Sequence, residues 1–316
     1  MRRVIGLSAG NRGGSAEILL KLALRAALDV GVEVGLVRVD DLNLSLGPDA
    51  GADDADWFWD QLMNSDGLIV STPIYARTIP GKLRLLGDKI SGPQADVAFT
   101  SEILRMRAAG EDLAVDFTID ERVLRPRVAG FIAVGGSIPG HWKSYALPLM
   151  HSLTQSSQIG IVDQVQFAAA GSPSSIVLQP AALERAAQLG RAVAEQAGRD
   201  FAEVVYRGAP GSCPICHLDV IVLTGGNSVE CATCGARGTL VVHGAEVEVA
   251  FTADGLEQSV MSMTEKLAHF EEVQATAAQH AALREQITRA ADRINEWGAT
   301  LVPERGITFQ TGAKPA

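Results

Sequence analysis

Residues 1–30 read MRRVIGLSAGNRGGSAEILLKLALRAALDV, and this stretch decides the fold. Val4–Leu7 is a short apolar run, typical of a strand that is buried on both faces of a parallel sheet. The glycine-rich segment Ser8–Ser15 follows, and apolar residues then recur at helical spacing from Ile18 onward, with Ser15 as the expected N-cap. This order places unpaired backbone N–H groups at the positive end of a helix dipole. It therefore predicts an anion site, for which phosphate is the usual occupant.

The loop lacks the residues of two common nucleotide motifs. No lysine follows its glycines, as a P-loop requires, and Gly10, Gly13 and Gly14 do not have the G-x-G-x-x-G spacing of a dinucleotide site. Asp40, at the end of the next strand, could imitate a ribose-binding acid, but acids are common at that position. The loop therefore favours a monophosphate such as flavin mononucleotide (FMN). The alternative is an ordinary strand-to-helix turn.

The composition excludes several kinds of partner. The chain has 316 residues, of which 47% are apolar, and a formal net charge of −10, which argues against non-specific binding to nucleic acid or anionic membranes. No apolar run reaches the length of a membrane span, and the run after Arg3 is too short for a signal peptide. We therefore expect a cytoplasmic protein with one large domain and something smaller.

Strand-like and helix-like segments alternate along the first 196 residues. After the first unit, the expected strands are 32–39, 66–71, 128–134 and 162–167, and the expected helices are 53–63, 81–90, 144–155 and 180–196. This alternation predicts an α/β fold with a doubly wound, five-stranded parallel sheet, which binds ligands at the carboxyl ends of its strands. The long connection 91–127 has little regular pattern apart from 101–109, and connections of this length are usually functional or mobile.

Three segments at the expected strand ends carry recognisable motifs. The first reads Ser8-Ala9-Gly10-Asn11-Arg12-Gly13-Gly14-Ser15-Ala16, the second joins Thr72-Pro73-Ile74-Tyr75 to Gly81-Lys82-Leu83-Arg84 and Asp88, and the third is Gly135-Gly136-Ser137. Residues 3 to about 196 thereby resemble the flavodoxin-like NAD(P)H-dependent FMN reductases, which include quinone reductases, azoreductases and iron–sulfur flavoproteins. The first segment is similar to the family's G-S-P-R-x-x-G-N-T, but Ala9, Asn11 and Ala16 replace its serine, arginine and threonine.

The resemblance implies which residues hold the cofactor. The first loop would wrap the FMN phosphate, the backbone of Pro73–Tyr75 would lie along the isoalloxazine ring, and the ring would be bordered by Arg77 or Thr78. The glycines after the fourth strand would allow close approach of the flat ring. The implied cofactor-binding residues are Ser8, Gly10, Asn11, Arg12, Gly13, Gly14, Ser15, Thr72, Pro73, Ile74, Tyr75, Arg77, Gly135, Gly136 and Ser137. The iron–sulfur branch is not indicated, because Leu44–Pro48, where that branch carries cysteines, has none.

The resemblance also implies an activity for an FMN-binding domain of residues 1–200. Hydride would pass from NAD(P)H through bound FMN to a quinone, to another aromatic acceptor, or to free flavin for a partner monooxygenase. The cofactor performs this chemistry, so we name no catalytic acid or base. The alternative is a flavodoxin-like electron carrier or a partner-docking protein without NAD(P)H turnover of its own.

All four cysteines belong to one module, residues 206–250. Cys213, Cys216, Cys231 and Cys234 form two C-x2-C knuckles separated by 14 residues, a gap that fits a hairpin. The pattern predicts a closed structural zinc site, and disulfides are disfavoured in a cytoplasmic chain. Iron shares the four-thiolate geometry, but rubredoxin usually has a longer gap and a glycine after both knuckles, whereas His217 follows the first knuckle here. Zinc is favoured, and the absence of a basic cluster argues against a nucleic-acid-binding ribbon.

The tail, residues 258–300, has a helical pattern. Ser262-Met263-Thr264-Glu265 has the form of a capping box and predicts a helix that reaches about Trp297. Its apolar stripe comprises Leu267, Phe270, Val273, Ala277, Ala281, Ile287, Ala291 and Ile294. The stripe fits packing on its own domain and pairing in a homo-dimer or tetramer equally well, and the resemblance implies an oligomer. The histidines show no metal-ligand spacing, although His141 could face the flavin.

Overall fold

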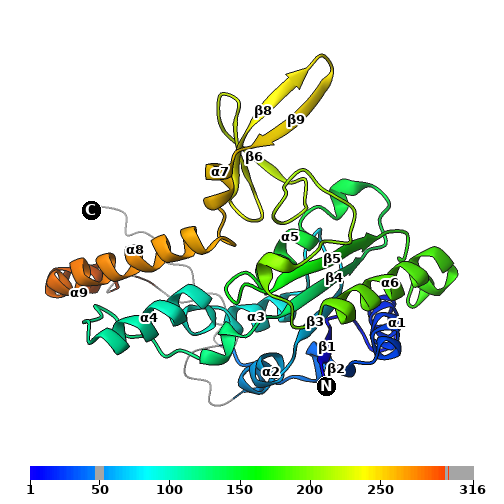
Figure 1. The fold of residues 1–316 in the computed structure, drawn as a ribbon, viewed down its shortest axis with the longest axis horizontal. Helices are drawn as coiled ribbons and strands as arrows, with labels where there is room; N and C mark the ends of the chain where they lie inside the picture. Colours follow the sequence, from blue (N-terminus) through cyan, green and yellow to red (C-terminus); the bar gives the residue numbers. More distant parts are fainter. Residues whose placement is uncertain (47–52, 296–297, 299–316) are drawn as a thin grey trace, which may run out of the picture.

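A five-stranded parallel sheet forms the centre of the molecule (Figure 1). The computed structural model describes residues 1–46, 53–295 and 298. The strands are β1 (Arg3–Ser8), β2 (Glu33–Arg38), β3 (Gly67–Pro73), β4 (Val128–Val134) and β5 (Gly160–Phe167), in the order β2-β1-β3-β4-β5. The central strands β3 and β4 are buried almost throughout, as their continuous apolar runs predict. The doubly wound sheet expected from the sequence is confirmed.

Helices cover both faces of this sheet. One face carries α1 (Ser15–Val30) and α6 (Pro180–Gln196), and the other carries α2 (Asp54–Met63), α3 (Gly81–Ile90) and α5 (Ala146–His151). Two separate apolar cores result, one on each side of the sheet. The helices α1 and α6 approach closely at Gly190, where a Cβ atom would lie 1.9 Å from the carbonyl oxygen of Ala23. Only glycine fits there.

Several elements differ from their expected bounds, among them two helices that cover the sheet and one in the long connection. Ser15 is the first residue of α1, and Gly14 occupies the N-cap position without a side-chain hydrogen bond. The helix expected over 144–155 is limited to α5, because the chain after His151 continues as turns that include the left-handed residue Gln158. The connection 91–127 contains α4 (Val97–Ala109), which begins earlier than expected because the Asp96 carboxylate accepts hydrogen bonds from the N–H groups of its first turn.

The chain after residue 200 builds a second sheet and the tail. The strands β6 (Ile221–Gly225), β7 (Ser228–Cys231), β8 (Arg237–His243) and β9 (Glu246–Phe251) form an antiparallel sheet that projects from the body (Figure 1). The helices α7 (Ala253–Glu257), α8 (Met263–Ala282) and α9 (Arg284–Asn295) follow. Ser262 caps α8, as predicted, but the single long helix expected there breaks at Leu283. Its expected end at Trp297 lies outside the described residues.

The first half of α8 packs against α4. The rings of Phe270 and Phe99 meet edge to face with centroids 5.1 Å apart, and buried Lys266 forms an ion pair of 2.7 Å with Asp96. The tail therefore packs on its own chain over this half, and it holds the long 91–127 connection in place. Among the described helices, none has the length and apolar character needed to cross a membrane.

Candidate cofactor site and four-cysteine cluster

In a doubly wound sheet, a crevice is expected where the connections after two neighbouring strands run to opposite faces of the sheet. Here β1 and β3 are neighbours, α1 covers one face, and α3 covers the other. The loops after these two strands touch. The Ala9 N–H donates to the Ser71 carbonyl at 2.9 Å, and a Cβ atom on Gly10 would lie 3.3 Å from the Pro73 ring. The first and second sequence-predicted loops thus meet at the switch point.

The first loop offers hydrogen-bonding groups that are not used within the protein. The Ser8 and Ser15 hydroxyls are buried and have no hydrogen-bond partner among the described residues. Gly14 has no side chain to cap α1, so no side chain at the N-cap accepts a hydrogen bond from the first N–H groups of the helix. Gly13 has a φ of +72°, which only glycine adopts readily. Unused hydroxyl and amide groups around a helix N-terminus suit a phosphate, so the residues present fit the phosphate of FMN.

A buried acid lies in the first turn of the same helix. Glu17 is fully buried, and Arg38 donates to its carboxylate at 2.9 and 3.1 Å. The hydrogen bonds from Arg38 are the main reason why the pKa of Glu17 falls to about 2, and Lys21 also pairs with it. Since two cations compensate Glu17, its charge does not oppose an anion at the helix end. This pair could not be predicted from the sequence, because its members are 21 residues apart.

The second loop adopts an uncommon backbone conformation. Ala76 and Arg77 have φ values of 47° and 74°, in the left-handed region that residues other than glycine seldom occupy. The turn is closed by two backbone hydrogen bonds between Tyr75 and Thr78, of 3.0 and 2.9 Å. Such conformations persist where the surroundings impose them, and they concentrate at functional sites.

Arg77 ties this second loop to the chain after β4. Its Nη2 donates to the Ser144 hydroxyl at 2.8 Å, and its guanidinium lies 4.3 Å from the centroid of the Tyr145 ring. Its Nε is buried without a partner among the described residues. The second and third loops are therefore held together by a cation–π contact and a hydrogen bond.

A fourth loop, residues 168–179 after β5, also borders the site. A Cβ atom on Gly136 would lie 2.8 Å from the Gly171 Cα, and the Ser174 hydroxyl donates to the Gly13 carbonyl at 2.8 Å. This loop was not among those predicted from the sequence. The signal was present, because Gly171-Ser172-Pro173-Ser174-Ser175 follows the fifth strand with the same small and hydroxyl-bearing residues as the other loops.

Three large aromatic side chains are exposed beside these loops. Tyr75, Trp142 and Tyr145 are 52%, 52% and 45% exposed, and they follow β3 and β4 at their carboxyl ends. We call these three residues the aromatic rim. Their exposure leaves flat apolar surfaces next to the loops at the strand ends. His141 contacts Trp142, with the ring centroids 5.8 Å apart.

The fifteen predicted cofactor residues all lie at this one edge of the sheet. They lie at the ends of β1, β3 and β4, the three central strands, or in the loops after them. Ser137, Asn11 and Arg12 are exposed, and Arg12 forms a surface ion pair of 3.1 Å with Asp41. The structure brings the predicted residues together, and their binding roles stay predictions.

Comparison with known proteins agrees with this geometry. Residues 2–173 match the family model described as NADPH-dependent FMN reductase. The chain belongs to this family. It is therefore an oxidoreductase of the FMN reductase type.

Two relatives resemble this FMN reductase family member over most of their lengths. Flavone synthase cfoJ of Aspergillus candidus is 34% identical and aligns over 81% of this chain and 83% of its own. A solved structure called flavone reductase has a TM-score of 0.80 and 25% identity, and the match covers 95% of this chain and 99% of the other. The likeness therefore extends beyond the family region into the second sheet and the tail.

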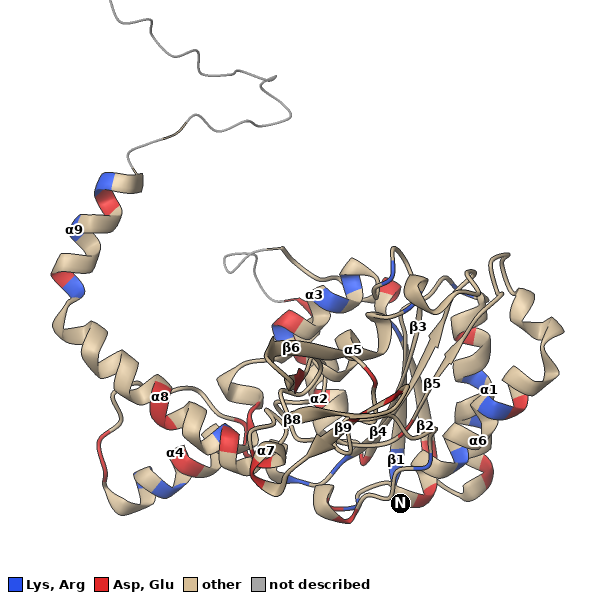
Figure 2. Cartoon of the chain, turned by 90° about the horizontal axis from the view of Figure 1, so that it is seen from above, with Lys and Arg blue, Asp and Glu red and all other residues tan. Residues whose placement is uncertain are grey.

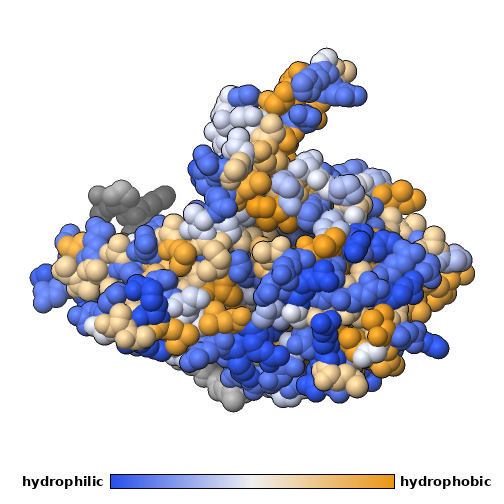
Figure 3. Space-filling model, viewed as in Figure 1, coloured by the Kyte–Doolittle hydropathy of each residue, from blue (hydrophilic) through white to orange (hydrophobic). Residues whose placement is uncertain are grey.

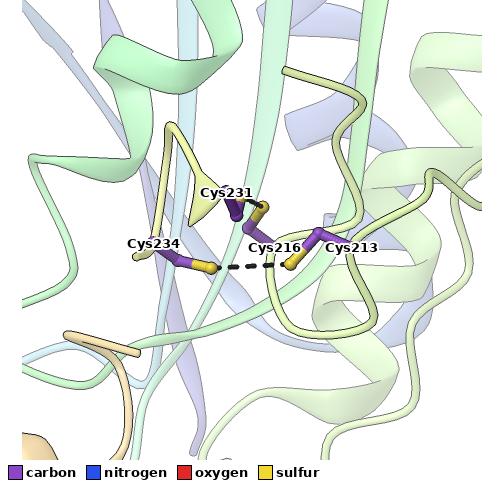
Figure 4. Close-up of side chains that lie close together, drawn as sticks. All are labelled: Cys213, Cys216, Cys231 and Cys234. Atoms are coloured by element: carbon purple, nitrogen blue, oxygen red, sulfur yellow. Dashed lines mark hydrogen bonds between the residues drawn. The ribbon is translucent and has the colours of Figure 1, made fainter. Parts of the chain in front are cut away.

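The four cysteines converge on one buried point (Figure 4). Their Sγ atoms all lie within 4.8 Å of one another, with Cys213 and Cys234 3.5 Å apart and Cys216 and Cys231 3.4 Å apart. Sulfurs around a tetrahedral zinc ion would be separated by about 3.8 Å, given a Zn–S distance of roughly 2.3 Å. Contacts with the other three sulfurs and burial raise the pKa of the Cys216 thiol, so four thiolates here need a cation. The donor set fits a metal ion.

Both knuckles close in the same way. The His217 N–H donates to the Cys213 carbonyl at 2.9 Å, and the Gly235 N–H donates to the Cys231 carbonyl at 2.8 Å. Both donor residues are left-handed, with φ values of 57° and 75°. The first knuckle thus makes the turn with histidine where the second uses glycine. His217 is supported by stacking on Tyr206, with the ring centroids 3.7 Å apart.

Buried hydrogen bonds of one side chain, Gln164, join the cysteine cluster to the parallel sheet. Gln164 on β5 donates to the Cys216 carbonyl at 2.8 Å, and its Oε1 lies 2.9 Å from Nε2 of His151. His151 is fully buried, and its Nδ1 has no hydrogen-bond partner in the part of the chain that the structure describes. Burial lowers the pKa of His151 to about 4.

Because His151 is buried, we expect the folded protein to lose stability in mild acid. An unfolded histidine titrates near 6.5 and the folded one near 4, so between these values the unfolded chain binds more protons and stability falls as the pH decreases. The expected loss from pH 7 to pH 5 is about 2 kcal/mol. Denaturant titrations should show that His151→Asn loses about that much less than the wild type over this range. His280→Asn, at an exposed position of α8, should behave like the wild type, and equal losses in all three proteins would contradict the prediction.

Proposed function

We propose that this protein is an FMN-dependent NAD(P)H oxidoreductase that reduces flavone-type substrates, which are planar aromatic ketones with a conjugated C=C bond. Family membership supports the NAD(P)H and FMN chemistry, and two relatives whose names contain flavone support the acceptor class. The observation that carries the choice of an aromatic acceptor is the aromatic rim beside the strand ends. Bound FMN would supply the chemistry, which is hydride transfer from NAD(P)H to the acceptor.

The chain's own residues have distinct tasks in this proposal. The hydroxyls of Ser8 and Ser15 and the N–H groups at the start of α1 would bind the phosphate. The backbone of Pro73–Tyr75 would lie along the ring, and Gly135 and Gly136, which lack side chains, would let the ring approach closely. The aromatic rim would stack on a flat substrate.

The overall reaction balances without a catalytic acid or base from the chain. One flavone, one NAD(P)H and one proton give one flavanone and one NAD(P)⁺. The hydride becomes the new hydrogen on the β-carbon of the conjugated ketone, and a solvent proton adds to the α-carbon. The exposure of the rim leaves water access to that carbon. We therefore assign binding and orientation, but no proton transfer, to the residues of the site.

The relative named flavone synthase favours a second candidate, the opposite reaction. In that direction a flavanone loses two hydrogens, and an electron acceptor such as dioxygen takes them. The site requirements are the same, because substrate and product differ only at one C–C bond. The direction of the reaction therefore depends on which substrate and which electron acceptor are supplied.

The test is anaerobic spectroscopy of the purified protein after addition of FMN. The flavin absorbance should bleach with NADPH or NADH and recover when flavone is added, with a product two mass units heavier. Recovery with a quinone but not with flavone would overturn the acceptor class and retain the reductase. Flavin that stays oxidised would favour an electron carrier, and a protein that takes up no FMN would overturn the proposal. Flavanone incubated in air tests the second candidate.

Removal of a rim side chain should weaken substrate binding. Trp142→Ala removes one flat stacking surface, and we expect KM for flavone to rise roughly tenfold, since an aromatic contact contributes about 1.5 kcal/mol. FMN affinity should not change. Trp57→Ala removes a similarly exposed tryptophan from α2 and should leave KM at the wild-type value. Steady-state kinetics with flavone measure both, and an unchanged KM for the Trp142 variant would place the substrate elsewhere.

We also propose that the four cysteines hold a structural zinc ion. Full burial and four sulfur donors support a closed site with no position for substrate. Iron is the alternative, and it would give the protein a red, rubredoxin-like absorbance. Zinc would leave only the flavin spectrum visible, so the spectrum of the purified protein distinguishes the two metals.

A further inference from the structure

Many basic side chains on the surface of this protein lie beside an acid. Hydrophilic residues cover much of the body in Figure 3, and Figure 2 shows acidic residues on α1, α4, α6 and α8. Arg12 pairs with Asp41, for example, and Arg84 pairs with Asp88. Such pairing is expected in a chain that has 37 acidic and 27 basic residues. A basic side chain without an acidic partner is therefore a departure that needs a reason.

The loops after β1, β3, β4 and β5 contain no acid. Asp and Glu are absent from residues 8–16, 71–87, 134–151 and 167–183, which include the three predicted cofactor loops and the loop after β5. A basic side chain among these loops has no carboxylate within them to neutralise it. The loops therefore favour a ligand, or a reacting group, with negative charge.

Arg77 is a basic residue that the structure holds among these loops. In the part of the chain that the structure describes, no carboxylate pairs with its guanidinium, and its Nη2 donates to the Ser144 hydroxyl. Its Nε is buried without a partner. Its Nη1 makes no hydrogen bond to a described residue and is not buried, so this group can reach a ligand. Arg77 thus has an unneutralised charge and an unused donor.

The guanidinium of Arg77 is fixed before any ligand binds. The left-handed backbone at Arg77 is enclosed by the hydrogen bonds between Tyr75 and Thr78. Beyond the backbone, the side chain reaches Ser144 and the ring of Tyr145, 4.3 Å from the guanidinium. A cation that is already in place stabilises developing charge without the cost of reorganisation.

Reduction of a conjugated ketone places negative charge on one atom of the substrate. When hydride adds to the β-carbon, the electrons of the C=C bond move toward the carbonyl, and the carbonyl oxygen becomes an enolate oxygen. A solvent proton then adds to the α-carbon and restores the neutral ketone. A cationic N–H donor beside that oxygen would lower the barrier, because the oxygen carries more charge in the transition state than in the substrate.

We propose that Arg77 stabilises the enolate oxygen of the acceptor through a hydrogen bond from Nη1, an inference that rests on the proposed function. Tyr75 and Tyr145, two of the three residues of the aromatic rim, adjoin Arg77 along the chain or in space. A flat ketone stacked on the rim therefore lies beside this cation. Lys143 is the other cation next to the rim, but its Nζ donates to the Ile138 carbonyl at 3.1 Å. Arg77 would transfer no proton, and it would select acceptors that have a conjugated carbonyl group.

Stopped-flow spectroscopy under nitrogen tests this role by separating the two half-reactions. Arg77→Gln should slow flavin reoxidation by flavone about a hundredfold, the effect of losing one donor to an oxyanion. Flavin reduction at saturating NADPH should keep its wild-type rate. Arg77→Lys retains the charge and should lose less than about tenfold, and Lys143→Gln removes a neighbouring charge and should behave like the wild type. The flavin content of each variant checks that it is folded and loaded.

Two results of this experiment would overturn the proposal. Reoxidation of Arg77→Gln at the wild-type rate would mean that the cation does not act on the acceptor. Equal slowing of both half-reactions would mean that Arg77 acts on the flavin or on the fold instead. A loss in Lys143→Gln alone would assign the role to Lys143.

A binding measurement tests the same charge without turnover. The probe is 3-hydroxyflavone, a planar ketone whose acidic hydroxyl lies beside the carbonyl and whose anion absorbs at longer wavelength than the neutral form. A pH titration with the oxidised, FMN-loaded protein should show that the wild type prefers the anion over the neutral form about tenfold more than Arg77→Gln does. The two proteins should bind neutral flavone equally.

The outcomes separate this inference from the proposed function. Equal preference for the anion in the wild type and in Arg77→Gln would overturn the role of Arg77, whether or not flavone is reduced. A wild type that prefers the anion but transfers no hydride to flavone would instead overturn the proposed function, and enolate stabilisation with it.

Discussion

Ser15→Asp should weaken FMN binding by about a hundredfold or more without loss of the fold. Ser15 is the first residue of α1, and an acid in a first helical turn favours the helix by about 0.5 kcal/mol. The same carboxylate would lie where the phosphate binds. Two unit charges about 4 Å apart repel by about 4 kcal/mol at an effective dielectric constant of 20, which exceeds the energy of a hundredfold change. Quenching of FMN fluorescence by the apoprotein measures the affinity.

Two further variants separate charge from shape at this position. Ser15→Ala removes the unused hydroxyl and should weaken FMN binding only about tenfold, the cost of a hydrogen bond to a charged group. Ser262→Asp makes the same substitution at the N-cap of α8, far from the site, and should have no effect on FMN affinity. If Ser15→Asp bound FMN as well as the wild type, the phosphate would not lie at the start of α1.

Cys216→Ser should abolish metal binding and unfold the cysteine module. A hydroxyl replaces one of four thiolates in a closed site, and the free energy of metal binding in such modules, about 10 kcal/mol, is also their folding free energy. Elemental analysis should find one zinc per wild-type chain and almost none in the variant. Limited proteolysis should then cut within residues 206–250. Ala232→Ser changes an exposed residue of the other knuckle and should retain zinc and resist cleavage.

The same substitution tests how the module is coupled to the parallel sheet. Gln164 bonds both the Cys216 carbonyl and His151, so release of the knuckle leaves a buried amide without its acceptor. Such a group costs about 1–3 kcal/mol, and the melting temperature of the remaining domain should fall. The candidate flavin site draws on loops after β1, β3 and β4, so FMN should still bind. A variant that keeps its zinc and its melting temperature would show that Cys216 is not a ligand.

The fold and most of the site could be predicted from the sequence because their signals are local. Continuous apolar runs predicted β1, β3 and β4, and the bounds of α3, β4 and α6 were confirmed to the residue. The cysteine spacing predicted the cluster, since two knuckles and a hairpin fix where the sulfurs meet. The first three loops could be selected because parallel strands place their carboxyl ends at one edge.

The sequence by itself thus determined the order of the strands and helices along the chain, the loops of the candidate flavin site and the composition of the four-cysteine cluster. Only the tertiary structure decided which distant residues meet: Glu17 with Arg38, Gln164 with Cys216, and the 168–179 loop with Gly13 and Gly136. It also showed that the predicted apolar stripe of the tail is covered by α4 at Phe270 and exposed at Ile287. The reason is physical. Hydrophobic periodicity and turn chemistry act between near neighbours in the chain, whereas burial and pairing depend on how complete elements pack.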